Sequence, residues 1–310
     1  MTDSAGEPMR VAQARGLNDR TQGPERYMAM LRPALDEALA VLPPACTVPL
    51  ALGLPPDRPG RPQNLASQLQ SRLEAAYHGR LQPVIVFELG HAATLYALDT
   101  AGNSMRHGSI PLCLVAGVDS YLDPETLEWL DDSDQLHGGG PFNNAWGFIP
   151  GEAAAAMLVV RPDLRARSPI PMQAEVLGVS TGCETKLIKT DAVCIGEGLT
   201  QAFRQVLQCL PAEARVDNIF CDMNGEAYRA DEYGFTALRT RERFFDATAF
   251  IAPADCWGDV GAAGAVLHAA MAVACSAQGY GRGPLSLVWA SSEGGERAAA
   301  LIHAPFVSRE

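Results

Sequence analysis

The chain has few basic side chains for its length. Its 310 residues include 24 Lys and Arg against 36 Asp and Glu, so the formal net charge at pH 7 is −12. This negative excess argues against nucleic acid or an anionic membrane surface as the main partner. No apolar run approaches the length of a membrane span, and the first residues, MTDSAGEPMR, lack the apolar core of a signal peptide. We therefore expect a cytoplasmic protein without a membrane segment.

The cysteines and histidines lack the spacing of metal or redox sites. None of the eight cysteines belongs to a C-x-x-C motif, and most lie in apolar runs. In a reducing compartment such cysteines behave as small buried hydrophobes. Five of the six histidines lie apart from one another and receive no chemical role: His78, His107, His137, His268 and His303. We expect no disulfide, no metal and no cofactor.

The remaining composition is that of an ordinary globular chain, with 47% hydrophobic and 19% charged residues. Residues 1–24 are polar and aperiodic, and we expect a loosely ordered arm there, ahead of a single domain over 25–310. Residues 122–137 are rich in acidic side chains, and we interpret this stretch as a solvent-exposed surface segment. Apolar spacing predicts helices over 26–42, 65–77, 198–209 and 262–277, and strands over 47–54, 174–181, 218–223, 285–292 and 298–303. Elements in this order predict an α/β layered fold with buried strands.

The most informative stretch is 83–120. Its pattern predicts a short buried strand over 84–87, a helix from 92 to a stop at Gly108, and a second buried strand over 112–117. A strand that turns sharply into a helix places the turn residue at the helix N-terminus, where free N–H groups favour negative charge. An acyl-transfer enzyme would keep its nucleophile at such a turn, and here the turn carries His91.

This stretch resembles the β-ketoacyl-acyl carrier protein synthase family, the condensing enzymes of the thiolase fold. In that family a strand ends in Cys, a helix with small residues follows, and the next strand ends in a Gly-Gly-Val-Asp-Ser-like segment, matched here by Gly117–Ser120. The resemblance implies a layered α-β-α-β-α fold of two similar halves, about 25–160 and 161–310. The first half looks shortened, because nothing here matches the family's first strand and Gly-rich turn. His91 stands at the position of the family's nucleophilic Cys.

The resemblance implies that the family's other two catalytic positions are substituted as well. The family's first catalytic His follows a strand that matches 218–223, and Asn224 stands at its position. Gly225–Ala227 replaces the threonine-rich turn that contacts pantetheine. The segment 256–265, CWGDVGAAGA, is similar to the family's Gly-His-Thr-x-Gly-Ala-Ala-Gly segment, with Asp259 in place of the second His. The family's Lys before that His has no counterpart.

Three further residues are expected near the site in structural roles. Glu152, within the strand-like run 146–160, matches the family's buried Glu, and a carboxylate in so apolar a run needs hydrogen-bond partners. Cys256 and Gly258 immediately precede Asp259. We interpret all three as parts of the scaffold.

The substituted positions do not support the family's reaction. Decarboxylative condensation needs a thiolate to hold the acyl chain and donors that stabilise an enolate and an oxyanion. An imidazole at a helix N-terminus lacks the stabilisation that a thiolate gains there. Asn224 could still donate to a carbonyl oxygen, but an ionised Asp259 would repel an enolate.

Three functions therefore stay open. The first is a non-condensing protein of fatty acid or polyketide biosynthesis, which binds an acyl carrier protein or acyl-CoA or pairs with an active synthase. The second is an enzyme of altered acyl-transfer or hydrolytic chemistry, with His91 as base, Asp259 as its orienting carboxylate and Asn224 as donor. The third is a true synthase that uses another thiol, Cys221 or Cys256. Two local basic clusters could receive an acidic carrier or a pantetheine phosphate: Arg161, Arg165 and Arg167, and Arg239, Arg241 and Arg243.

These interpretations predict features of the three-dimensional structure. The helices centred on Ala97 and Leu267 should be packed between sheets and buried all round. His91 should lie within hydrogen-bond reach of Asp259 or Asn224, with its pKa raised if the partner is Asp259. By analogy with the family we expect a homodimer, or a heterodimer with a synthase. The strand 112–117 should then lie near the two-fold axis, because an apolar edge strand needs cover.

Overall fold

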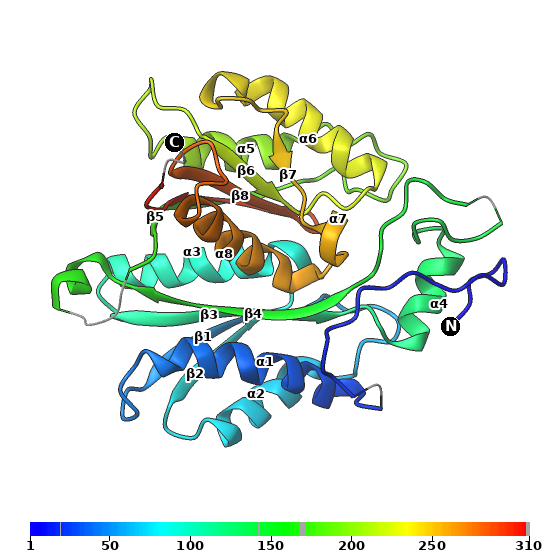
Figure 1. Ribbon diagram of the computed structural model, residues 1–310, viewed down its shortest axis with the longest axis horizontal. Helices are drawn as coiled ribbons and strands as arrows, with labels where there is room; N and C mark the ends of the chain where they lie inside the picture. The colour runs from blue at the N-terminus through cyan, green and yellow to red at the C-terminus, as the bar shows by residue number, and fades with distance from the viewer. Residues whose placement is uncertain (19, 142, 168–171, 308–310) are drawn as a thin grey trace.

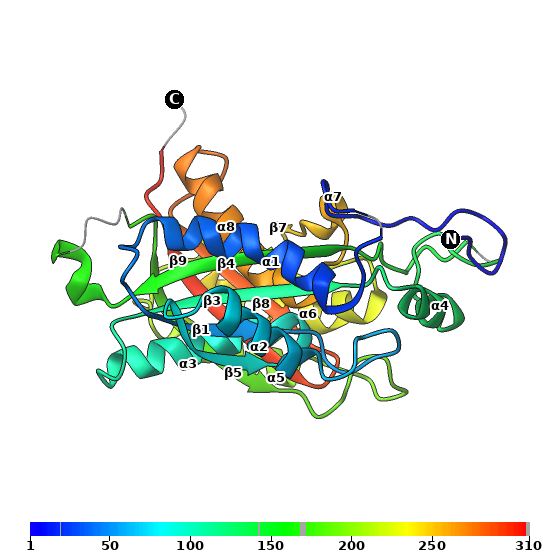
Figure 2. The same cartoon turned by 90° about the horizontal axis from the view of Figure 1, so that it is seen from below.

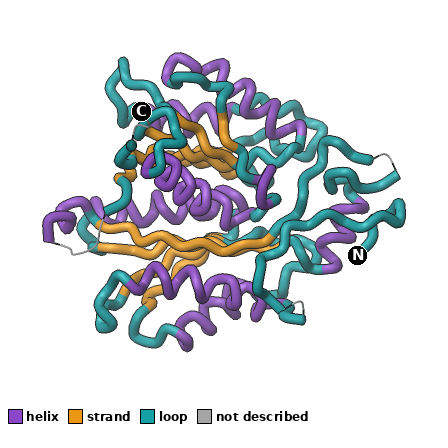
Figure 3. Tube along the Cα trace, viewed as in Figure 1, coloured by secondary structure: helices purple, strands orange, loops and turns teal. Residues whose placement is uncertain are grey.

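The chain folds into two β-sheets with two helices packed between them. The computed structural model describes residues 1–18, 20–141, 143–167 and 172–307. Figure 1 shows α3 (Ala93–Arg106) and α8 (Gly264–Ala277) in the middle layer, with one sheet on each side and further helices outside. Figure 3 shows the same alternation of helix and strand layers. The predicted layered α-β-α-β-α architecture is therefore confirmed.

The first sheet has four strands in the order β2-β1-β3-β4, of which β4 is antiparallel to β3. Its strands are β1 (Val48–Gly53), β2 (Leu81–Phe87), β3 (Leu112–Ser120) and β4 (Glu152–Val160). Helices α1 (Gly23–Ala40) and α2 (Leu65–Ala76) cover its outer face, as Figure 2 shows from below. The second sheet has one strand more, in agreement with a shortened first half.

The second sheet has the order β5-β9-β8-β6-β7. Its strands are β5 (Glu175–Cys183), β6 (Asn218–Cys221), β7 (Phe250–Ile251), β8 (Leu285–Ser291) and β9 (Glu296–His303). Helices α5 (Glu197–Leu207) and α6 (Ala227–Thr240) lie on its outer face (Figure 1). The remaining short helices are α4 (Pro124–Asp132), α7 (Ala254–Trp257), and the 3-10 turns η1 (Gly90–Ala92), η2 (Pro162–Arg167), η3 (Arg241–Arg243) and η4 (Gly261–Ala263).

The core between the sheets consists mostly of small apolar side chains, which let the central helices approach the strands closely. Gly117 of β3 shows how close this approach is. A Cβ atom at Gly117 would lie 2.3 Å from the carbonyl oxygen of Ala262 in η4, so any other residue would push the two segments apart. This contact fixes the start of α8 against the end of β3, where the candidate site lies.

Two expectations about exposure are wrong. Helix α3 exposes Thr100 and is therefore not buried all round. The C-terminal half of α8 exposes Ala270 and Ala274, which lie one helical turn apart, so α8 is not buried all round either. Its Ala-rich sequence showed that the helix is apolar, but small side chains at the margin of a layer can face solvent at little cost. The strand over 112–117 is also not an edge, because β3 is hydrogen-bonded to β1 on one side and β4 on the other. The edge strands of this sheet are β2 and β4.

Two polar segments are better anchored than their composition suggests. In the predicted arm, Ala12 donates its backbone N–H to the Pro150 carbonyl and accepts from the Glu152 N–H. The acidic segment 122–137, interpreted as a solvated excursion, contains α4, whose Leu127 and Leu130 are buried. Among the described residues, none of the helices combines the length and apolar character that a bilayer crossing requires.

Candidate functional site

The candidate site lies where the two central helices begin. His91 is in the η1 turn ahead of α3, and Asp259 lies just before η4 and α8. His91 Nε2 is 2.9 Å from each carboxylate oxygen of Asp259, and both residues are almost fully buried. Gly261 donates its backbone N–H to Asp259 Oδ1 at 2.8 Å. The expected contact between His91 and Asp259 is therefore present.

Asn224, which follows β6, completes the set expected from the sequence. Its Nδ2 donates to Asp259 Oδ2 at 2.7 Å and to Glu226 Oε2 at 2.9 Å. The three site residues expected from the sequence, His91, Asn224 and Asp259, thus come together in one buried cluster. Both hydrogens of the Asn224 amide are directed at carboxylates, so this amide is not available to a substrate carbonyl in this arrangement.

Arg229, the main cation beside His91, was not among the site residues predicted from the sequence. Its NH2 group is 3.4 Å from His91 Nε2, and its other nitrogens donate to Asp222 Oδ2 at 3.0 Å and Glu226 Oε2 at 3.3 Å. Arg229 is only 1% exposed. A signal was present in the sequence: Arg229 shares one helical face with Tyr233 and Thr236, and that face is buried.

The charges of the cluster stabilise one another. Burial lowers the pKa of His91, but the Asp259 carboxylate outweighs it, and the pKa is raised above the ordinary 6.5. Burial raises the pKa of Asp259, but His91 and Arg229 hold it well below its ordinary range. Both shifts favour the charged forms, an imidazolium facing a carboxylate. Burial lowers the pKa of the neighbouring His268 to about 3, so that ring is neutral.

Glu152 has the environment of a scaffold residue. Its carboxylate accepts from Arg26 Nε and NH2 at 2.6 Å each, from Ser120 Oγ at 2.8 Å and from the Ala14 N–H at 3.1 Å. These contacts join the N-terminal arm, α1, β3 and β4. Every partner is a protein group of the scaffold, which supports the interpretation of Glu152 as a structural residue.

The thiols and the glycine near Asp259 differ in environment. Cys256 is exposed on α7, whereas Cys221 is fully buried, and burial raises the pKa of its thiol far above the usual range. Gly258 has a φ of 72°, and a Cβ atom there would lie 2.8 Å from the Ile149 carbonyl oxygen. Gly258 therefore shapes the turn that delivers Asp259.

Neither of two cavities in the described structure is lined by His91. One, of about 290 Å³, lies between the N-terminal arm, α1 and α4 and includes Arg26 and Leu127. The other, of about 350 Å³, lies between α1 and α2 beside Arg32 and Arg72.

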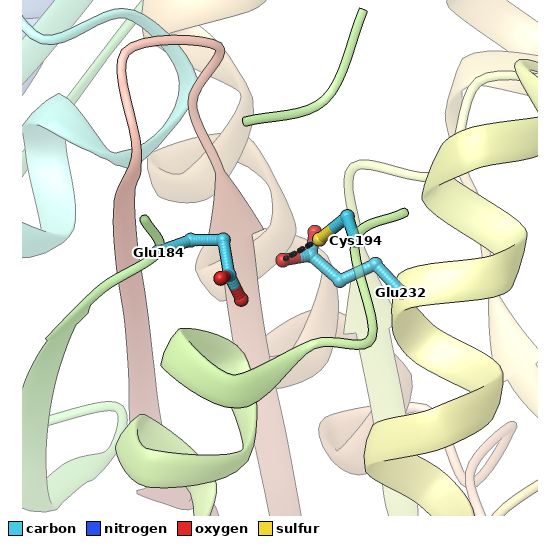
Figure 4. Close-up of side chains that lie close together, drawn as sticks. All are labelled: Glu184, Cys194 and Glu232. Atoms are coloured by element: carbon cyan, nitrogen blue, oxygen red, sulfur yellow. Dashed lines mark hydrogen bonds between the residues drawn. The ribbon is translucent and has the colours of Figure 1, made fainter. Parts of the chain in front are cut away.

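A second group of buried polar side chains lies at the start of α5. Figure 4 shows Glu184 after β5, Cys194 in the following loop and Glu232 on α6, with candidate ligand atoms within 4.8 Å of one another. Glu232 is paired with the buried Arg297, and Glu184 Oε2 accepts the Gly198 N–H at 2.9 Å. Burial raises the pKa of the Cys194 thiol to about 11, so it is protonated at neutral pH. Arg297 already supplies a positive charge beside these carboxylates. We therefore interpret Glu184, Cys194 and Glu232 as a group that anchors the loop.

The two arginine clusters are partly engaged within the protein. Arg161 pairs with Asp163, while the side chains of Arg165 and Arg167 lie outside the described residues. Arg239 donates to the Ile195 carbonyl, and Arg243 donates to the carbonyls of Leu207 and Pro211. Arg241 is exposed.

Comparison with known proteins agrees with the architecture. A chain from a complex of a type II polyketide synthase acyl carrier protein with its ketosynthase superposes with a TM-score of 0.74 at 13% identity, covering 95% of this chain and 87% of that one. The ketosynthase from module 6 of the bacillaene synthase of Bacillus subtilis gives 0.71 at 15% identity, covering 93% and 58%. The ishigamide ketosynthase/chain length factor gives 0.63 at 18% identity, covering 96% and 88%. The protein therefore has the thiolase-like fold of ketosynthases.

Sequence comparison gives a more limited likeness. The chain is 26% identical over 165 residues to the non-reducing polyketide synthase CTB1 of Cercospora nicotianae, and equally to that of Cercospora beticola. The match covers 52% of this chain but 7% of either synthase, so the chain spans a small part of these relatives. No family model matches the chain. The protein is ketosynthase-like and distantly similar to polyketide synthases.

Proposed function

We propose that this ketosynthase-like protein does not catalyse condensation and acts instead by binding, as the partner of an active synthase or of its acyl carrier-bound or CoA-bound chain. The observation that carries the proposal is the buried contact of His91 with Asp259. The sequence resemblance aligns these two residues with the nucleophilic Cys and a catalytic His of the β-ketoacyl synthase family. The Asp259 carboxylate raises the pKa of His91 and so favours the imidazolium, which has no lone pair with which to attack a thioester. The carboxylate beside it would oppose an enolate rather than stabilise it.

The surroundings of the ion pair support the same proposal. Asn224 is committed to Asp259 and Glu226, and Cys221 is buried with a strongly raised pKa. Protein side chains therefore satisfy the polar groups that a condensing enzyme would keep free for its substrate. The third function, a synthase that uses Cys221, receives no support from this environment, whereas Cys256 is exposed and can be tested directly.

The test is incubation with malonyl and acyl groups on acyl carrier protein and on CoA, followed by intact-protein and peptide mass spectrometry. We expect no 3-oxoacyl product and no acylated residue, together with a measurable complex in native mass spectrometry with either the acyl carrier or a partner synthase. An acyl group trapped on Cys256 or Cys221 would contradict the proposal. The absence of any complex with both classes of partner would contradict its second part.

One observation favours a second candidate, an acyl-transfer or hydrolytic enzyme that uses His91. In the part of the chain that the structure describes, His91 Nδ1 has no hydrogen-bond partner, while Nε2 is held by Asp259. This arrangement would suit a base oriented by a carboxylate, but the raised pKa of His91 opposes loss of the proton that the ring must give up to act as a base. Thioester hydrolysis that appears only at alkaline pH, and that His91→Gln abolishes, would favour this candidate.

A further inference from the structure

The loop from 184 to 196, between β5 and α5, contains every lysine of the sequence. These are Lys186 and Lys189, whereas the remaining basic residues are arginines. Lys186 is exposed. Lys189 instead has a left-handed backbone, with φ of 59°, and its side chain is 19% exposed. A non-glycine residue rarely adopts this conformation unless its surroundings hold it there.

The Lys189 ammonium lies at a junction of three other segments. It donates to Gln135, from the segment after α4, and to Glu293, at the turn between β8 and β9. It is 3.5 Å from Glu226 Oε1, just before α6. The ring centroids of Phe148 and Tyr228 are 5.7 and 5.8 Å away, within range of a cation–π interaction.

A short chain of contacts leads from this junction to His91. Glu226, beside Lys189, accepts from Asn224 Nδ2, and the same amide nitrogen donates to Asp259. Asp259 in turn holds His91 Nε2. Side-chain exposure falls from 19% at Lys189 to 5% at Glu226, and Asp259 and His91 are buried to a similar degree, at 5% and 6%. Lys189 and its partner Glu293, at 19% and 36% side-chain exposure, thus form the solvent-facing end of the network that leads to His91.

The loop is also fastened at both ends, so that Lys189 lies near its centre. At one end Glu184 donates its N–H to the Gly295 carbonyl and accepts the Gly198 N–H at its side chain. At the other end the Cys194 thiol donates to Glu232, as Figure 4 shows. With the ends fixed, release of the central contact would free the middle of the loop without unfolding the sheet behind it.

From this arrangement we infer that Lys189 is a latch that closes the His91 site, and that access to His91 requires its ammonium to leave Glu226 and Glu293. The inference goes beyond the proposed function, because it concerns access and applies whichever ligand the site takes. It assigns to Lys189 a conformational role rather than a catalytic one.

Backbone hydrogen–deuterium exchange on the full-length protein tests the latch. Lys189→Met keeps the length of the side chain and removes its charge, and Lys186→Met on the same loop is the matched control. With Lys189→Met we expect exchange about tenfold faster in peptides covering 185–193, 224–229 and 89–93, because charged hydrogen bonds are lost. The control and the peptides of β3 should remain at the wild-type rate. Faster exchange in 185–193 alone, or equally throughout the chain, would overturn the inference.

Amine acylation gives a second measurement that does not depend on a variant folding normally. With an N-hydroxysuccinimide acetate, mass spectrometry can follow Lys186 and Lys189 separately in one sample, because no other lysine competes. In the wild-type protein we expect Lys189 to react at least about tenfold more slowly than Lys186, since hydrogen-bonded charge holds its ammonium. The Glu293→Gln substitution should bring the acylation rate of Lys189 closer to that of Lys186. Equal rates for the two lysines in the wild-type protein would show that the latch is not closed.

Discussion

His91 Nε2 lies 2.9 Å from both carboxylate oxygens of Asp259, across the start of the two central helices. The two residues are 168 positions apart in the chain and belong to different halves of the fold. Their contact therefore joins the two halves at the start of both central helices. Removing one member would leave the other charge buried without its main partner.

Asp259→Asn should strongly destabilise the protein. Breaking a buried, hydrogen-bonded ion pair typically costs about 3–5 kcal/mol, and the free energy of unfolding in urea should fall by about that much. The double variant His91→Gln/Asp259→Asn removes both charges and should recover part of the loss. A single variant as stable as the wild type would show that the ion pair does not hold the halves together.

The contribution of His91 to stability should depend on pH in a defined direction. Its pKa in the folded state is raised above 6.5, so the unfolded chain releases the proton first as the pH rises. The difference in unfolding free energy between the wild type and His91→Gln should be constant just below pH 6.5. Above pH 6.5 it should shrink by at most about 1.4 kcal/mol per pH unit until the folded pKa is passed.

The comparison with the variant is needed because His268 titrates in the opposite sense. Burial lowers the pKa of His268 to about 3, so its contribution is lost as the pH falls below 6.5. That effect is common to both proteins and cancels in the difference. A difference that grows with rising pH would contradict a raised pKa at His91.

The sequence predicted the central elements of the site because each lies in an ordered local pattern. His91 follows a strand and precedes a helix, and Asp259 lies in a Gly- and Ala-rich segment before another helix. The thiolase-like topology then brings the two turns together. The resemblance to the synthase family, carried by these ordered segments, was therefore the basis for expecting His91 close to Asp259 or Asn224.

Other features depended on contacts that no local pattern records. Lys189 gains its partners from segments near 135, 148, 226 and 293, and nothing around it in the sequence indicates that they converge. Arg229 lies on the buried face of α6, where a charged side chain is tolerated because Asp222 and Glu226 neutralise it. The exposure of Ala270 and Ala274 was missed because an Ala-rich pattern does not distinguish a fully buried helix from a marginal one.

Arg26→Met should test the structural interpretation of Glu152. The guanidinium makes two hydrogen bonds of 2.6 Å to this carboxylate, which is fully buried. Its removal should lower the free energy of unfolding by about 3–5 kcal/mol. Arg26→Met combined with Glu152→Leu should recover much of the loss, because paired replacement of buried charges is often neutral. If the double variant lost more unfolding free energy than the two single variants lost together, the pair would have a further role.

A homodimer remains our prediction, and the structure indicates which edge could form it. Strand β2 pairs with β1 alone among the described strands, and its Ile85 is 46% exposed. An edge strand with an exposed apolar side chain is suited to pairing with a second copy. Ile85→Lys should weaken the dimer by about tenfold or more in sedimentation velocity, since a buried charge is costly. Val41→Lys, at a side chain of equal 46% exposure after α1, is the matched control. A wild-type monomer at micromolar concentration would contradict the prediction.

His91→Cys alone should not restore a condensing enzyme. The new thiol would lie beside an ionised Asp259, whose negative charge disfavours the thiolate and opposes the enolate formed from malonate. Asn224 would still direct its amide at Asp259 and Glu226 rather than at a substrate carbonyl. We expect this variant to form no 3-oxoacyl product from malonyl and acyl carrier substrates, and restoration to require His at positions 224 and 259 as well. The triple variant therefore accompanies the single one in the same assay, with product followed by mass spectrometry and folding checked by circular dichroism. If the single His91→Cys variant condensed substrates, Asp259 could not have the opposing role assigned to it, and the site would be a ketosynthase site that lacks only its thiol.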